Sequence, residues 1–138
     1  MKYSSDPALA ALTARFLELS LPKPEWTHEA HFAVAFCLLA DSTRDAFTEM
    51  PDLIRAYNKA TGVANSNHEG YHETITLASL KAAQHHLSGG PLHKDLARLM
   101  HGRYGSSKWM LDHWSRERLF SVEARISWCA PDLAPLSF

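Results

Sequence analysis

The chain has 138 residues, with 14 basic and 15 acidic side chains and a net charge of −1. This length suits one domain, and the near-neutral charge argues against a basic nucleic-acid-binding protein and against an acidic disordered tail. Hydrophobic residues make up 46% and charged residues 21%, which is typical of a soluble globular chain, but nine histidines are an unusually large number.

Two cysteines, Cys37 and Cys129, lie far apart and form no CxxC pair. A disulfide framework is therefore not expected, and the reduced cytoplasm is the default compartment. The N-terminus lacks the pattern of a signal peptide. The longest apolar run, 32–40, is far shorter than the ~20 residues that span a bilayer, so we expect no membrane association.

The first half of the chain has the pattern of three helices. Ser5 or Asp6 caps the first, which ends at the Pro-rich segment 21–24. Thr27 is the expected N-cap of the second helix. The third carries apolar residues from 46 to 57 and contains Pro51, so it is either a kinked helix or two short helices.

Gly62 is a helix C-cap signal, and the segment 62–70 is rich in Asn, Ser and Gly and predicts a loop. A fourth helix is expected over 71–87 and a fifth from Pro91 to about Gly102. Short helical pieces follow at 109–114 and 121–128. No segment alternates with a period of two, so the sequence predicts one all-α domain over 1–138, with five to seven helices in orthogonal or bundle-like packing.

Three histidines have the strongest claim to a functional site. His28 and His31 are three residues apart and share one side of the second helix in its first turn, and His72 begins the fourth helix. The positive end of a helix disfavours a protonated imidazole, and the neutral form is both the metal ligand and the general base.

Three interpretations follow from this placement. The histidines could bind a divalent metal (zinc, nickel, iron or manganese), with Glu29 or Glu73 as a fourth ligand or as a base. They could instead line a metal-free pocket, or they could be purely structural, because HxxH alone is a weak motif.

The fourth helix adds a polar stripe of His72, Thr76, Ser79 and Ala83. Because the stripe contains no Lys or Glu, it could line a pocket between the second and fourth helices, with Thr76 and Ser79 binding a substrate. Ordinary solvent exposure is the competing interpretation.

Other polar residues have weaker claims. Arg116 and Arg118, next to aromatic residues, could anchor a carboxylate or phosphate, or pair with acidic neighbours. Tyr57 and Asn58 are a further candidate pair for substrate binding. His68 lies in the loop, and the remaining histidines are expected to be surface or capping residues: His85, His86, His93, His101 and His113.

Four segments together resemble a family of small uncharacterised bacterial proteins with (W/F)THxxH and GYHET(I/L)T motifs. These segments are 26–31 (WTHEAH), 70–76 (GYHETIT), 116–121 (RERLFS) and 131–133 (PDL). The resemblance covers about 26–135 and transfers no activity. It marks as family-like positions His28, His31, His72, Glu73, Thr74 and Thr76.

A looser likeness is to the DinB-type metal-binding bundles, which gather three histidines from different helices. This chain lacks their late HxxxH pair. The likeness implies only that such a bundle can hold a metal.

Two hypotheses of function follow. In the first, the chain is a small cytoplasmic enzyme that acts on a small polar molecule, with His28, His31, His72 and Glu73 as catalytic residues. In the second, it is a ligand-binding or regulatory module without catalysis, for which a homodimer is one compatible state.

Overall fold

The computed structural model describes residues 2–138. It is all-helical over these residues, with seven α-helices and three short 3₁₀ turns and no β-strand, which confirms the predicted fold class. The helices are α1 (Asp6–Leu17), α2 (His28–Ala40), α3 (Ala46–Ala60), α4 (Glu73–His86), α5 (Leu92–His101), α6 (Arg116–Leu119) and α7 (Val122–Ile126). The 3₁₀ turns are η1 (Lys23–Glu25), η2 (Arg103–Gly105) and η3 (Trp109–Asp112).

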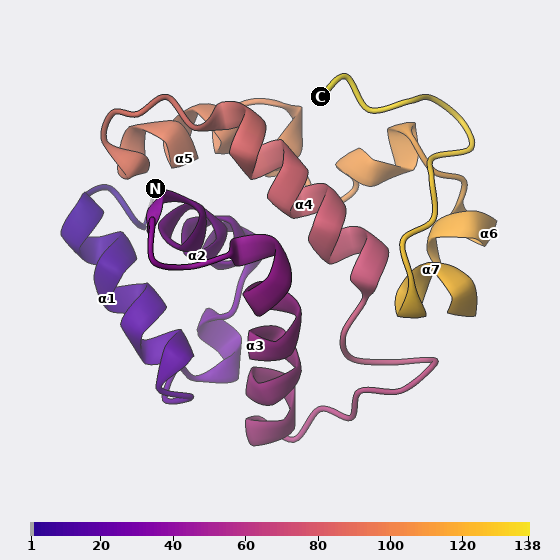
Figure 1. Cartoon of the computed structure of the whole chain (residues 1–138), viewed down its shortest axis with the longest axis horizontal. Coiled ribbons are helices and arrows are strands. Elements are labelled where there is room, and N and C mark those ends of the chain that lie inside the picture. Colours follow the sequence, from indigo (N-terminus) through magenta and orange to yellow (C-terminus); the bar gives the residue numbers. More distant parts are fainter. Residues whose placement is uncertain (1) are drawn as a thin grey trace.

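Helix α2 is the centre of the fold. Its sequence, HEAHFAVAFCLLA, is apolar on every side after the first turn, which is the pattern of a helix surrounded by protein. Helices α1, α3, α4 and α5 all contact it, and Figure 1 shows α2 end on among them. The side chains of α2 therefore form the middle of a single core, and the polar residues of its first turn lie at the core's edge.

Local sequence signals place the starts of the first three helices. The Ser5 side chain accepts a hydrogen bond from the N–H of Ala8, and Thr27 accepts one from Ala30. Asp45 caps α3 through the N–H of Thr48. Helix α3 continues through Pro51 to Ala60, so of the two alternatives at Pro51 the structure has the single helix.

Gly62 ends α3 as predicted, in a left-handed conformation with φ +82°. The N–H of Val63 donates to the carbonyl of Asn58 at 2.8 Å, and the N–H of Gly62 donates to that of Lys59 at 3.3 Å. This pair of bonds is a Schellman motif, which supplies donors for the last carbonyls of the helix.

The loop between α3 and α4 is held by the Asn65 side chain. Its Oδ1 accepts hydrogen bonds from the Asn58 amide and from the N–H of Tyr71, both at 3.0 Å, and its Nδ2 donates to the carbonyl of Arg55. The loop also packs closely against Gly70, so that a Cβ at this position would collide with the carbonyl oxygen of Ala64.

We expect Gly70→Ala to lower the free energy of unfolding by about 2 kcal/mol, because it adds a collision to the strain of a positive φ. Gly62→Ala is the matched control, since Gly62 has nearly the same φ and open space around it. Gly62→Ala should lower the free energy of unfolding by about 1 kcal/mol, because it adds only the strain of a positive φ. Urea unfolding of both variants measures the difference, and equal losses would refute the collision.

The C-terminal third packs beside α4, and Figure 1 shows α6, α7 and the tail on the side of α4 away from α1. His113 is buried here at the C-cap position of η3, so of the predicted surface or capping roles the surface one was wrong. Its Nδ1 lies 3.0 Å from the carbonyl of Ala134, and its own carbonyl accepts from the N–H of Leu133. A histidine between two aromatic neighbours, Trp109 and Trp114, thus fastens the tail.

No helix in the described part of the chain is long and apolar enough to cross a lipid bilayer.

Candidate functional site

A cleft of about 410 Å³ opens between α2, α3 and the start of α4. His31 comes from α2, Asn58 from α3, and His72 and Thr76 from the α4 region. A small hollow of about 50 Å³ shares His31 and Thr76 with the cleft and extends it to Ser79. The two cavities therefore lie where the sequence predicts a polar pocket, between the second and fourth helices.

His31 is the residue of this cleft best suited to chemistry. Its Nδ1 lies 2.7 Å from the carbonyl oxygen of Thr27, which can only accept, so Nδ1 carries the proton. Burial lowers the pKa of His31 to about 4, so the imidazole is neutral at physiological pH. Its Nε2 therefore offers a lone pair, and no side chain or backbone group in residues 2–138 makes a hydrogen bond to it.

Trp26 sets the position of the His31 ring. The two ring centroids are 3.8 Å apart, and Trp26 in turn stacks on Phe16 at 4.4 Å. In the sequence, Trp26 stands out only as the first residue of the WTHEAH segment. Its contact with His31 makes it part of the cleft wall, a role that only the folded chain reveals.

His72 lies at the cleft, but both of its ring nitrogens are occupied. Nδ1 accepts a hydrogen bond from the N–H of Ile75 at 3.1 Å, so His72 is the N-cap of α4. Nε2 donates to the carbonyl oxygen of Leu119 at 2.7 Å, which joins α4 to α6. Burial lowers the pKa of His72, which keeps the ring neutral and suited to these two bonds.

His28 faces away from the cleft. Its Nε2 lies 2.7 Å from the carbonyl oxygen of Tyr104, and its ring packs edge-on against Phe32. The spacing of three residues does place His28 and His31 in one helical turn, but the structure brings only His31 to the cleft.

The predicted metal ligands do not converge. Among residues 2–138, no group of three or more His, Cys, Asp or Glu side chains is placed to hold a metal ion. Both ring nitrogens of His72 are bonded in this arrangement, and Nε2 of His28 is bonded to the carbonyl of Tyr104.

The polar stripe of α4 faces inward. His72, Thr76 and Ala83 are buried and Ser79 is half-buried, so solvent exposure does not explain its lack of charge. Glu73 lies beside this stripe and accepts a hydrogen bond from the Tyr71 hydroxyl. Burial, with the nearby Glu73 carboxylate, raises the pKa of Tyr71, so its phenol stays protonated.

Thr74, one of the family-like positions, is fully buried and structural. Its hydroxyl donates to the carbonyl of Ser127 at 3.0 Å and accepts from the N–H of Cys129 at 3.1 Å. These bonds hold the chain after α7 against α4.

The remaining predicted substrate-binding residues lie elsewhere or have structural partners. Tyr57 is buried and donates its hydroxyl to the carbonyl of Leu21, whereas Asn58 lines the cleft. Arg118 donates to the carbonyl of Ala130 at 2.6 Å. Arg116 is exposed and borders a separate hollow of about 240 Å³.

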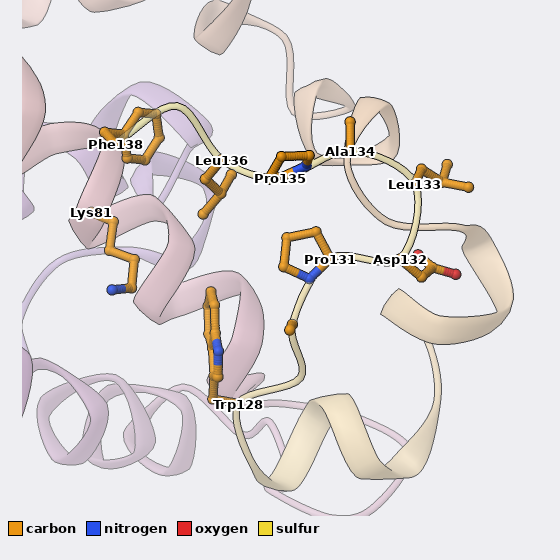
Figure 2. Close-up of a pocket in the computed structure, with 10 residues that line it drawn as sticks. Lys81, Trp128, Pro131, Asp132, Leu133, Ala134, Pro135, Leu136 and Phe138 are labelled. Carbon is orange, nitrogen blue, oxygen red and sulfur yellow. The ribbon is translucent and has the colours of Figure 1, made fainter.

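A second hollow of similar size, about 420 Å³, lies along the C-terminal tail. Figure 2 shows Trp128 and Pro131 bordering it, with Leu136, Phe138 and Lys81 at one end. The Lys81 ammonium lies 5.5 Å from the Trp128 ring centroid. This groove is open and contains none of the histidines, so the His31 cleft is the stronger candidate site.

Comparisons with models of protein families, with curated proteins and with solved structures found no match to this chain. The resemblance to the GYHET(I/L)T family and the likeness to DinB-type bundles therefore stay predictions.

Proposed function

We propose that this chain is a small enzyme that binds a small polar molecule in the cleft between α2, α3 and α4, with His31 as the group that accepts a proton from it. The observation that carries the proposal is the neutral imidazole of His31, a residue that lines the cleft: its Nδ1 is fixed by the Thr27 carbonyl, and its Nε2 has no hydrogen-bond partner among residues 2–138. A neutral, oriented imidazole is the form that acts as a general base.

Other groups of the cleft fit the binding of a polar molecule. Thr76 and Ser79 bring hydroxyls, and Asn58 brings an amide that also bonds to Asn65. Ile54 and Ile75 supply apolar surface between them. A mostly apolar cavity with a few convergent polar groups is typical of a small-molecule site.

The alternative function, ligand binding without catalysis, is favoured by one observation. A histidine whose pKa is lowered to about 4 is a weaker base than an ordinary imidazole, though still a good hydrogen-bond acceptor. Turnover of a bound compound, followed by NMR, separates the two functions: an enzyme converts it, and a binding module returns it unchanged.

The cytoplasm is the proposed compartment, since Cys37 and Cys129 are both free thiols. A metal-bound form would require His72 to give up either the cap of α4 or its bond to Leu119. Titrations of untagged protein with zinc, nickel, iron and manganese test this form. Metal binding should then be accompanied by a local loss of stability in α4.

Labelling with diethyl pyrocarbonate tests the free nitrogen of His31, because the reagent modifies unprotonated imidazole nitrogens. We expect His31 to be labelled and His72 to be protected. Between pH 7 and pH 5 the rate of labelling at His31 should change less than twofold, whereas labelling of a model peptide histidine of pKa near 6.5 should slow about 25-fold. Peptide mass spectrometry measures each site.

A screen of small polar metabolites by thermal shift then tests binding at the cleft. Compounds that stabilise the native protein should lose their effect in His31→Gln and keep it in His101→Gln, which changes an exposed histidine at the end of α5. The proposed site would be refuted by labelling at His72 but not at His31. It would also be refuted if the compounds stabilised His31→Gln as much as the native protein.

A further inference from the structure

Two arginines from distant parts of the sequence border a hollow of about 200 Å³ that is separate from the histidine cleft. Arg55 comes from α3 and Arg125 from α7, and between them lie Asn65, Ser66 and Asn67 of the loop that precedes α4. The fold thus brings two guanidinium groups and three small polar side chains to one cavity.

Both guanidinium groups are held in place. Nη1 of Arg125 donates to the carbonyl of Gly70 at 2.9 Å and to that of Tyr71 at 3.3 Å. The guanidinium carbon of Arg55 lies 4.2 Å from the centroid of the Tyr71 ring. An arginine stacked on an aromatic ring or tied to a carbonyl loses less side-chain entropy on binding a ligand than a freely moving one.

The loop adds hydrogen-bond donors. Ser66 Oγ accepts from the N–H groups of His68 and Glu69, so its own hydroxyl proton remains available. The Asn65 amide is used within the loop, whereas the Asn67 amide has no hydrogen-bond partner among residues 2–138.

Positive charge prevails in this cavity. Arg55 pairs with Asp52 at 3.1 Å, but the Asp52 side chain is 84% exposed, so solvent screens that attraction. Arg125 forms no ion pair with any described carboxylate. Two fixed cations therefore face at most one screened negative charge.

We propose that this hollow binds a phosphate group, either free or as the phosphomonoester of a small metabolite. The two guanidinium groups, the Ser66 hydroxyl and the Asn67 amide can donate from several sides, which suits the three terminal oxygens of a phosphomonoester better than the two of a carboxylate. Paired arginines bind phosphate oxygens through charge-assisted and often bidentate hydrogen bonds. This site involves neither His31 nor the proposed proton transfer.

Titration with inorganic phosphate at constant ionic strength, followed by isothermal calorimetry and amide NMR, tests the proposal. The native chain should bind phosphate saturably with a Kd on the order of 1 mM, about −4 kcal/mol, with shifts at Ser66 and Asn67. A phosphomonoester such as glycerol phosphate should bind at least as tightly if the natural ligand is a metabolite. Tighter binding of inorganic phosphate would assign the site to the free ion.

Arg55→Gln should weaken phosphate binding at least tenfold, and Arg55→Lys should weaken it less, since it keeps the charge but not the planar fork. Arg103→Gln is the matched control. Arg103 also lies over an aromatic ring, at 4.6 Å from Tyr104, and also has an acidic neighbour, Asp112, but it is outside the hollow.

Three results would overturn the proposal. The first is the absence of saturable binding in the native chain. The second is an equal loss of phosphate affinity in Arg103→Gln and Arg55→Gln, which would indicate that phosphate is attracted to positive charge in general. The third is amide shifts that lie outside the loop. His31→Gln should leave phosphate binding unchanged. The phosphate site and the function proposed for the cleft can therefore be confirmed or refuted independently of each other.

Discussion

His72→Ala should lower the free energy of unfolding by about 3 kcal/mol, because one substitution removes two interactions. The first is the cap on the N–H of Ile75, worth about 1 kcal/mol. The second is the bond to the Leu119 carbonyl, a residue only 2% exposed. Leaving a buried carbonyl without a donor costs about 1–3 kcal/mol. Urea unfolding followed by circular dichroism measures the loss.

His72→Asn separates the two interactions. Asn is a good N-cap residue, so the start of α4 should be kept, but its side chain is too short to reach the carbonyl of Leu119. We expect about two thirds of the loss seen in His72→Ala, with faster hydrogen exchange in α6. A loss below about 1 kcal/mol in His72→Ala would contradict the structural role of this histidine.

The second large effect is a loss of stability in mild acid. Burial lowers the pKa of His31 to about 4 in the folded chain, against about 6.5 in the unfolded chain. The unfolded state therefore binds the extra proton first, and stability falls as the pH drops from 6.5 towards 4. These two pKa values predict a loss of about 2 kcal/mol between pH 7.5 and pH 5 from His31, and the lowered pKa of His72 acts in the same direction.

Urea unfolding at pH 7.5 and pH 5 measures this loss, and His31→Gln should reduce it by about 2 kcal/mol. The comparison uses the difference between the two pH values, so it does not depend on how far the substitution itself destabilises the chain. His101→Gln serves as the control, because His101 is exposed. A wild-type stability that is flat over this range would show that the folded chain does not hold His31 in its neutral form.

The physical cause of the neutral histidines differs from the one that the sequence suggests. From residue positions alone, the neutral form is expected because the positive end of a helix disfavours a protonated imidazole. In the structure, removal of the imidazole from water is the largest cause at both His31 and His72. Burial is a property of the packed chain. The position of a histidine along a helix therefore predicts that its pKa is lowered, but it does not reveal that burial is the main cause.

Features that depend on neighbouring residues were predictable. Ser5 and Thr27 cap their helices through bonds to residues three positions later, and Gly62 ends α3 in a left-handed conformation. The spacing also predicted that the stripe residues of α4 share one face, since side chains three or four residues apart lie on the same side of a helix, but the inward direction of that face came from the structure. The sequence could not choose between the two alternatives at Pro51, because packing against the core stabilises a continuous α3 despite the missing hydrogen bond.

The residue pattern predicted the helices and most of their ends, and it offered a pocket between α2 and α4 as one of two interpretations of the α4 stripe. Long-range packing establishes which histidine at the cleft has a ring nitrogen without a protein partner. The carbonyl of Tyr104, 76 residues away, binds His28, and that of Leu119, 47 residues away, binds His72. His31 instead bonds to the local Thr27 carbonyl through Nδ1 alone. A hydrogen bond requires atoms within about 3 Å, and only the folded chain brings such distant groups that close.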